Sequence, residues 1–194
     1  MPCRRARTRC RGFTLSEVLV ALLVVALGSA GAAALQTRAL RTARAAARLS
    51  AGTRLAASLA ERMRANPVAM ALADADNPYL GFDYDAASGP PSAAASCDAG
   101  ADCDSVQLAA FDRFETAREV AAVAPGGRIR VCRDASPPDA STGLPGWHCD
   151  GRDEAPLAIK LGWRETDAPD APDAPRVLLL VGAGARAASP AGAP

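Results

Sequence analysis

One acidic residue lies where a charge is costly. Glu17 stands in the stretch Phe13–Leu35, whose other polar residues are two serines and a threonine. A carboxylate in an apolar membrane helix costs about 3 kcal/mol even on lenient insertion scales, and such residues usually have a partner and a function. We therefore expect Glu17 to pair with a cation.

The segments around Glu17 predict a membrane anchor. Residues 1–12 hold five arginines, the following apolar run is about as long as the roughly 20 residues that cross a bilayer, and arginines return after Gln36. Basic residues before the run favour a cytoplasmic N-terminus and export of the remainder. The arginines after it oppose this orientation, but the first flank usually dominates.

The heptapeptide Gly12–Val18 (GFTLSEV) resembles the processing site of type IV prepilins. In that family a short basic leader ends in glycine, prepilin peptidase cuts after it, and the new N-terminal residue is methylated. The resemblance implies cleavage between Gly12 and Phe13 and N-methylation of Phe13. It also implies that Glu17 pairs with the new amine, in its own chain or in a neighbouring subunit, and so sets the register of assembly.

The helical pattern continues to Asn66, where Pro67 stops it, since the residue before proline avoids helical geometry. The helix end RMRANP, Arg62–Pro67, resembles that of PilV-type minor pilins. Earlier in the same helix, four arginines recur at three- or four-residue steps and form a stripe. We interpret this stripe as a solvated face or as a contact with acidic residues of neighbouring subunits. Lipid headgroups and DNA are less favoured alternatives. The stripe comprises Arg38, Arg41, Arg44 and Arg48.

The remaining chain predicts a small head. Residues 70–96 read as irregular chain, and a helix is expected from Asp104 or Ser105 to about Val123. Its predicted buried face comprises Val106, Ala110, Phe114, Ala117 and Ala121, with Leu108 and Phe111 beside it. Three strands are expected at Arg128–Arg133, Leu157–Trp163 and Arg176–Val181. In the second, apolar residues recur at every other position, which is the pattern of a strand with one buried face.

Four cysteines lie beyond the predicted anchor, an even number suited to an oxidising compartment. Three pairings are possible; we favour Cys97 with Cys103 and Cys132 with Cys149. Zinc bound by these cysteines and His148 is a weaker alternative, because no Cys-x-x-Cys pair is present. The other two cysteines, Cys3 and Cys10, would be lost with the leader.

The residue types argue against catalysis and against nucleic-acid binding. The chain has 194 residues, one histidine and a formal net charge of +1, whereas a bulk nucleic-acid binder would be strongly basic. Asp98, Asp102 and Asp104 could attract calcium but lack the pattern of an EF-hand loop, so a solvated acidic loop is favoured. We expect no enzymatic activity, no cofactor, no bound metal and no nucleic-acid partner.

These observations predict an α+β, pilin-like fold, in which a long N-terminal helix packs on a small antiparallel-sheet head with one short helix. The expected divisions are a leader (1–12), a helix (13–66) that spans the membrane over 13–35, a periplasmic head (67–182) and a disordered tail (183–194).

The predicted function is that of a minor type IV pilin, which helps to assemble, prime or modify the pilus. By resemblance, its partners are prepilin peptidase, other major and minor pilins, the inner-membrane assembly machinery and the lipid bilayer. It would reside in the inner membrane and later in the fibre. A type II secretion pseudopilin is one alternative. Another is an exported or membrane-anchored binding protein with an ordinary signal peptide, cut near Ala32–Ala34.

Overall fold

The computed structural model describes residues 13–98, 102–124, 126–136, 138, 143–152, 155–164 and 173–182. The chain forms two compact units, Met1–Ala45 and Ala46–Pro194. The predicted leader and tail, with Cys3, Cys10 and Gly12, lie outside the described residues.

The first unit consists, where described, of the N-terminal part of helix α1, Leu15–Ala65. This part is rich in alanine and leucine and contains no proline, so nothing local interrupts the helix. An 18-residue window of α1 has a mean hydropathy of 2.5, and none of it is buried. Within the described part of the chain, α1 is the one helix long and apolar enough to cross a membrane.

Helix α1 ends one residue before the predicted stop. Asn66 leaves the helical region, and its side-chain oxygen accepts a hydrogen bond from the backbone N–H of Ala69, which caps the short helix α2, Pro67–Met70. Pro67 is tolerated as the first residue of α2 because that position needs no hydrogen-bonded N–H.

The head contains a four-stranded antiparallel sheet in the order β1-β2-β3-β4. Its strands are β1 Asp83–Asp85, β2 Arg128–Arg133, β3 Leu157–Gly162 and β4 Val177–Val181. The last three lie where the sequence predicts strands. Together with α1 and the short helix α3, Ser105–Val123, they confirm the predicted pilin-like α+β class.

Strand β1 is a correction, because residues 70–96 were expected to be irregular. It has three residues, two of them aspartates, and so shows no apolar alternation. Its place is fixed by its neighbour instead: the Arg128 guanidinium donates to both carboxylate oxygens of Asp83, at 3.0 and 2.8 Å. A turn of 3₁₀ helix, η1 Ala86–Ser88, follows.

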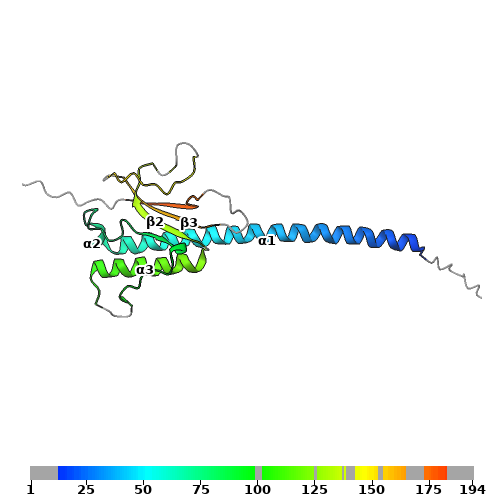
Figure 1. Ribbon diagram of the computed structural model, residues 1–194, viewed down its shortest axis with the longest axis horizontal. Coiled ribbons are helices and arrows are strands. Elements are labelled where there is room, and N and C mark those ends of the chain that lie inside the picture. Colours follow the sequence, from blue (N-terminus) through cyan, green and yellow to red (C-terminus); the bar gives the residue numbers. More distant parts are fainter. Residues whose placement is uncertain are drawn as a thin grey trace, which may run out of the picture. The chain divides into compact units, whose positions relative to one another are not determined.

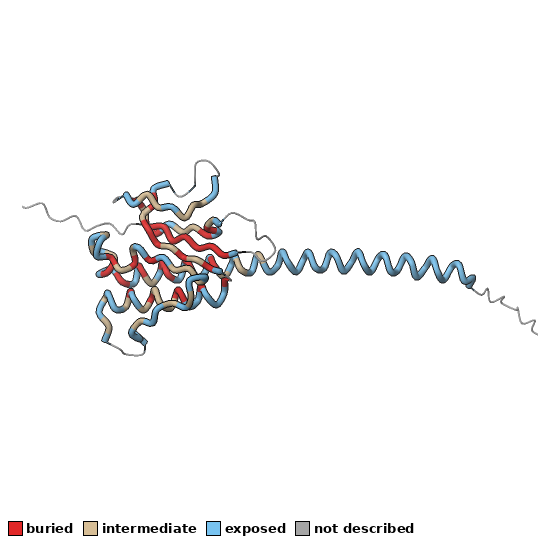
Figure 2. Tube along the Cα trace, in the orientation of Figure 1, coloured by how far each residue is buried: buried red, intermediate tan, exposed pale blue. Residues whose placement is uncertain are grey.

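Within the head unit, the C-terminal part of α1 lies between the sheet and helix α3, Ser105–Val123 (Figure 1). Buried residues concentrate where these three elements face one another (Figure 2). Helix α3 begins as predicted: the Asp104 side chain accepts from the N–H groups of Val106 and Gln107, and the side-chain oxygen of Gln107 accepts from the backbone N–H of Asp104.

The predicted buried face of α3 is partly wrong. Val106, Ala110 and Ala121 are exposed, and Phe111 and Phe114 are only half-buried. The residues of α3 that are buried are Ala109, Asp112, Thr116, Ala117 and Val120. The helix is rotated toward a face with two polar residues because other elements supply hydrogen-bond partners for Asp112.

Helix α1 and the sheet approach closely at Gly52. A Cβ atom there would lie 2.8 Å from Cζ3 of Trp163 and 3.2 Å from Cδ2 of Leu161. Both side chains are buried, so neither can move away freely. Glycine at this position permits the contact between helix and sheet.

Replacing Gly52 by valine should therefore lower the free energy of unfolding by about 1–3 kcal/mol, the usual cost of overpacking a core. Urea unfolding of the detergent-solubilised chain, followed by tryptophan fluorescence, measures this loss. Ala47→Val is the matched control, because Ala47 is exposed on the same helix. An equal loss in both variants would mean that β-branching, and not the contact with Trp163, is the cause.

Strand β3 is buried on both faces and not on one as predicted. The only lysine of the chain, Lys160, is fully buried on it. Its ammonium donates to a carboxylate oxygen of Asp134 and to the backbone carbonyls of Gly146 and His148. Asp134 and residues 146–148 thus form a covering segment on the second face of the sheet, and Lys160 holds them there.

Two disulfides connect the head. Cys97 is joined to Cys103, with their Cα atoms 5.9 Å apart, and Cys132 to Cys149, with their Cα atoms 6.2 Å apart. These are the pairs that the sequence favoured. The second one ties β2 to the segment that contacts Lys160. Such a link stabilises the fold mainly by restricting the conformations of the unfolded chain.

Candidate processing and assembly site

Helix α1 starts directly after the predicted cleavage position. Thr14 precedes the first turn, and its carbonyl oxygen accepts from the N–H groups of Glu17, at 3.1 Å, and Val18, at 3.2 Å. The Thr14 hydroxyl also accepts from the Glu17 N–H, at 3.3 Å. Threonine is a common N-terminal cap for this reason. A chain that began at Phe13 would enter a helix within two residues.

Phe13 is 81% exposed, and Gly12 lies outside the described residues. Phe13, on the C-terminal side of the predicted scissile bond, is therefore accessible to an enzyme. Cleavage there would create an amine about one helical turn from Glu17, because Glu17 is four residues further along the chain.

Glu17 lies in the first turn of α1, where the helix dipole favours a negative charge. Its side chain is exposed, and in the described part of the chain its carboxylate has no hydrogen bond or ion pair. A carboxylate of this kind, in an apolar setting, needs one cation to offset its desolvation. The amine of Phe13, on this chain or another, is a cation of the required kind.

The helix around Glu17 offers a large apolar surface. Its large side chains from Leu15 to Leu35 are between 48% and 81% exposed. They include Val18, Leu19, Val20, Leu22, Leu23, Val24, Val25 and Leu27. Contiguous apolar surface of this extent marks a membrane or protein contact. It can be buried by lipid or by the helices of neighbouring subunits, so the segment suits insertion followed by assembly.

The predicted site residues fall into two groups. Phe13 and Glu17 belong to the first unit, whereas the four disulfide-bonded cysteines belong to the head. The cysteines stabilise the head and supply no group to the processing site. Among the described residues, no cluster of three or more metal-ligating side chains occurs.

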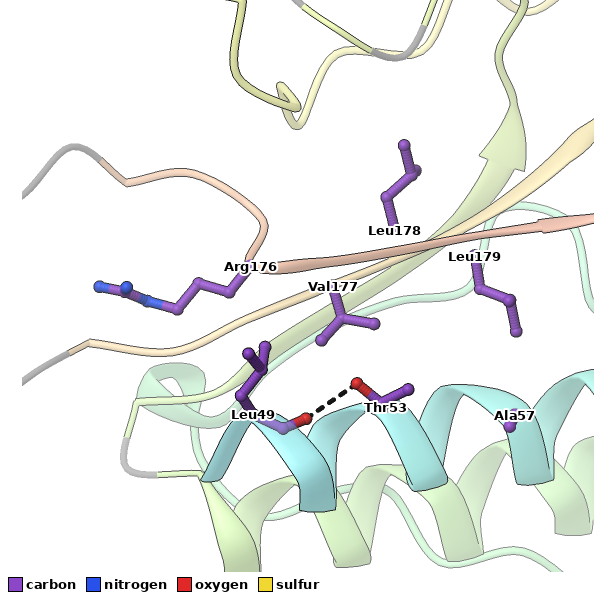
Figure 3. A pocket seen from close by; sticks show the side chains of 7 residues that line it. All are labelled: Leu49, Thr53, Ala57, Arg176, Val177, Leu178 and Leu179. Carbon is purple, nitrogen blue, oxygen red and sulfur yellow. Dashed lines mark hydrogen bonds between the residues drawn. The ribbon is translucent and has the colours of Figure 1, made fainter. Parts of the chain in front are cut away.

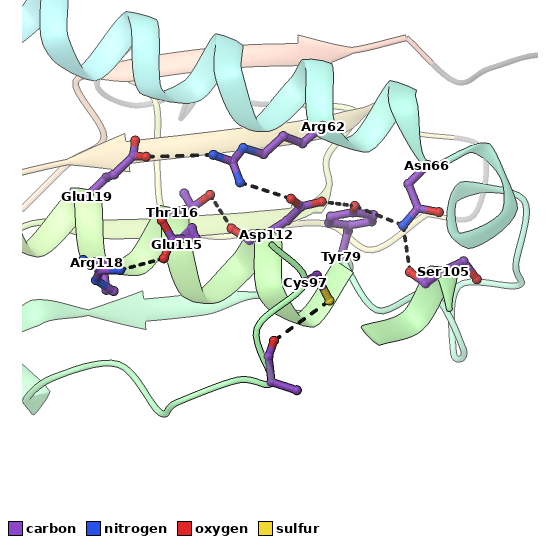
Figure 4. Close-up of polar contacts among 11 residues, drawn as sticks. Arg62, Asn66, Tyr79, Cys97, Ser105, Asp112, Glu115, Thr116, Arg118 and Glu119 are labelled. Atoms are coloured by element: carbon purple, nitrogen blue, oxygen red, sulfur yellow. Dashed lines mark hydrogen bonds and ion pairs between the residues drawn. The ribbon is translucent and has the colours of Figure 1, made fainter. Parts of the chain in front are cut away.

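A buried polar network, which the sequence did not reveal, attaches the end of α1 to the head (Figure 4). The carboxylate of Asp112 on α3 accepts from Arg62 of α1, at 3.1 Å, and from the Tyr79 hydroxyl, at 2.7 Å. The Asn66 side-chain amide donates to the Tyr79 hydroxyl and to the Ser105 carbonyl, at 3.3 and 2.7 Å. Burial, and next the bond to Asp112, raise the pKa of Tyr79 above its ordinary value of 10.0.

This network gives the end of α1 a structural role. Arg62 lies in the last turn of α1, and Asn66 follows the end of that helix four residues later. Arg62 bonds Asp112 and Asn66 bonds Tyr79, which are themselves hydrogen-bonded to each other. In the sequence, the only clue to this network was the spacing of Arg62 and Asn66 before Pro67. Their partners Asp112 and Tyr79 can be identified only from the fold.

Tyr79→Phe should lower the free energy of unfolding by about 2 kcal/mol, because a hydrogen bond to a buried carboxylate is lost. Since folding raises the pKa of Tyr79, its contribution is complete below pH 10 and declines as the pH rises above 10, where the unfolded chain ionises first. The variant should therefore lose less stability than the wild type between pH 10 and 12.

Urea unfolding at a series of pH values measures both effects. Tyr84→Phe is the matched control, because the Tyr84 hydroxyl donates to an uncharged carbonyl, that of Gly89, at 3.0 Å. Its loss at neutral pH should be smaller, about 1 kcal/mol. Equal losses in the two variants would show that the Asp112 carboxylate adds nothing to the Tyr79 bond.

The head also carries a shallow groove between α1 and the edge strand β4 (Figure 3). It is lined by Leu49, Thr53 and Ala57 of α1 and by residues 176–179. The Thr53 hydroxyl donates to the Leu49 carbonyl within the helix, at 2.9 Å. The groove therefore presents mainly apolar side chains, and its described lining contains no acid–base pair or nucleophile that could do chemistry.

The fold and the N-terminal segment together resemble those of type IV pilins and pseudopilins. Residues 7–33 match the family model described as the prokaryotic N-terminal methylation motif, which is typical of type IV pilins and pseudopilins. The motif implies processing by prepilin peptidase and assembly with pilins. Neither curated proteins nor solved structures yield a match to this chain.

The motif also agrees with the character of α1. An exposed apolar N-terminal helix is consistent with a prepilin that is anchored in the inner membrane before assembly. Pilin-like proteins are typically structural and not enzymatic.

Proposed function

We propose that this chain is a minor subunit of a type IV pilus. Prepilin peptidase cuts between Gly12 and Phe13, and the amine of Phe13 is then methylated. The first part of α1 holds the subunit in the inner membrane with its head in the periplasm. On assembly, the apolar surface of the same helix leaves the lipid and packs against the helices of other pilins. The subunit then helps to prime or modify the fibre.

The observation that carries this proposal is the position of Glu17. It is an exposed carboxylate without a described partner, on the first turn of an apolar helix, four residues after the residue that would become the N-terminus. A cleaved and assembled chain supplies the cation that Glu17 lacks. An ordinary anchor or signal peptide supplies none.

The helix end at Arg62–Pro67 and the disulfide-bonded head support a PilV-type minor pilin over a type II secretion pseudopilin. The signal-peptide alternative requires cleavage near Ala32–Ala34, which lies inside the unbroken helix α1. A peptidase that binds its substrate in an extended form would have to unwind the helix there.

The first test is the N-terminus of the mature protein, determined by mass spectrometry in cells with and without prepilin peptidase. We expect an N-methylated Phe13 that disappears when the peptidase is absent. A start near Leu35 or Gln36, or an uncut Met1, would overturn the proposal.

A second test separates the pilus from the secretion system. Deletion of the gene should reduce the number of surface pili and leave export of type II substrates unchanged. The opposite pattern would assign the chain to the secretion system.

A further inference from the structure

Three arginines follow the apolar part of α1 at close intervals. Arg38, Arg41 and Arg44 are all exposed and belong to the same compact unit as the apolar segment. At 1.5 Å per residue, they lie about 5, 9 and 14 Å beyond Leu35 along the helix axis. At 100° per residue, successive members differ by about 60° around the axis, so the three occupy one side of the helix.

These arginines have no counter-charge on their own helix. Between Glu17 and Glu61 the sequence contains no acidic residue. In the described part of the chain, none of the three guanidinium groups makes a hydrogen bond or an ion pair, whereas the surface arginines Arg64 and Arg118 each pair with a glutamate three residues earlier. A solvated charged helix normally mixes both signs; this one does not.

The position of the three arginines fits the headgroup layer of a membrane. Phe13–Leu35 covers roughly 34 Å of helix, close to the roughly 30 Å hydrocarbon core of a bilayer, and the headgroups add about 5–8 Å on each side. Arg38 therefore falls within the headgroup layer, and the long side chains of Arg41 and Arg44, which lie further out, can extend back toward the phosphates. The planar guanidinium binds phosphate oxygens through two parallel hydrogen bonds.

We propose that Arg38, Arg41 and Arg44 form a collar that binds the phosphate groups of anionic phospholipids at the outer surface of the inner membrane. The inference rests on the membrane-anchored stage of the proposed function. The collar offsets the unfavourable effect of exported arginines on insertion, and it holds the subunit at a fixed height until assembly withdraws it from the lipid.

Native mass spectrometry of the chain in detergent micelles tests the collar, with phosphatidylglycerol and phosphatidylcholine as probes. We expect the wild type to bind phosphatidylglycerol more tightly than phosphatidylcholine, with a contribution of about fivefold for each arginine near the phosphates. The triple variant R38Q/R41Q/R44Q should lose at least tenfold of this preference. The matched control R54Q/R64Q/R118Q removes three exposed arginines of the head and should keep the preference.

Several outcomes would overturn the collar. One is an equal affinity for the two lipids, or a preference that survives in the collar variant. Another is tight binding of duplex DNA, without a lipid preference, that is lost in the same variant. If the variant keeps the lipid preference and is absent from fibres, the arginines contact neighbouring subunits instead.

The lipid measurement is independent of the proposed function. Leader arginines, where they are retained, are common to all the variants, so the comparison also holds for an unprocessed chain. A collar-dependent preference without a methylated Phe13 refutes the pilin function alone. A methylated Phe13 without a collar-dependent preference refutes the collar alone.

Discussion

Glu17→Ala should abolish incorporation of the chain into pilus fibres and leave cleavage between Gly12 and Phe13 intact. Removing one member of a desolvated ion pair costs about 3–5 kcal/mol, because the other charge stays buried without a partner. At 1.4 kcal/mol for each factor of ten, this is a decrease in subunit incorporation of at least a hundredfold. The peptide bond that the peptidase cuts is unchanged.

The measurement is the amount of the chain in sheared fibres relative to the membrane fraction, by immunoblot, together with the mass of the mature N-terminus. Glu61→Ala is the matched control on the same helix. Glu61 is 71% exposed and pairs with Arg64, and such surface pairs contribute about 0–1 kcal/mol. Normal incorporation of Glu17→Ala would contradict the pairing and favour a signal or anchor segment in which Glu17 has no role.

Lys160→Ala should destabilise the head by about 3–5 kcal/mol, the usual cost of breaking a buried ion pair. The Lys160 side chain is fully buried, and that of Asp134 is 3% exposed. Without the ammonium, the Asp134 carboxylate and the carbonyls of Gly146 and His148 all lose a donor. The segment that covers the outer face of the sheet should then separate from β3, apart from its disulfide at Cys149.

Urea unfolding of the detergent-solubilised chain measures this loss through tryptophan fluorescence, because Trp147 lies in the covering segment. Arg152→Ala is the control: Arg152 is 73% exposed in its pair with Asp150, so its removal should cost less than 1 kcal/mol. The double variant Lys160→Met with Asp134→Leu should recover much of the stability, since apolar replacement of a whole buried pair is often neutral. A loss below 1 kcal/mol in Lys160→Ala would show that water reaches Asp134 in solution.

The local signals of the sequence were sufficient for the elements themselves. A run of apolar residues without proline predicts the helix that ends before Pro67, and Asp104 with Gln107 predicts the start of α3. These features depend on neighbours in the chain, through backbone hydrogen bonds and caps, so they can be found without the fold. The same applies to the heptapeptide around Glu17, whose signal is its order of residues.

The tertiary structure decided which faces are buried. Asp112 is buried on α3, and Phe114 is not, because Arg62 and Tyr79 from distant parts of the chain satisfy the carboxylate. Likewise, Lys160 can lie inside only because Asp134, Gly146 and His148 accept its hydrogen bonds. Alternation along a single strand cannot reveal such partners.

Strand β1 also depends on partners that are distant in the sequence. Its three residues pair with β2 through backbone bonds and through Arg128, which lies 45 residues further along the chain. The sequence by itself therefore determined the apolar helix, its N-terminal motif and the main strands, because their causes are local. The tertiary structure alone determined the buried polar partners and the short edge strand, because their free energy comes from groups that only folding brings together.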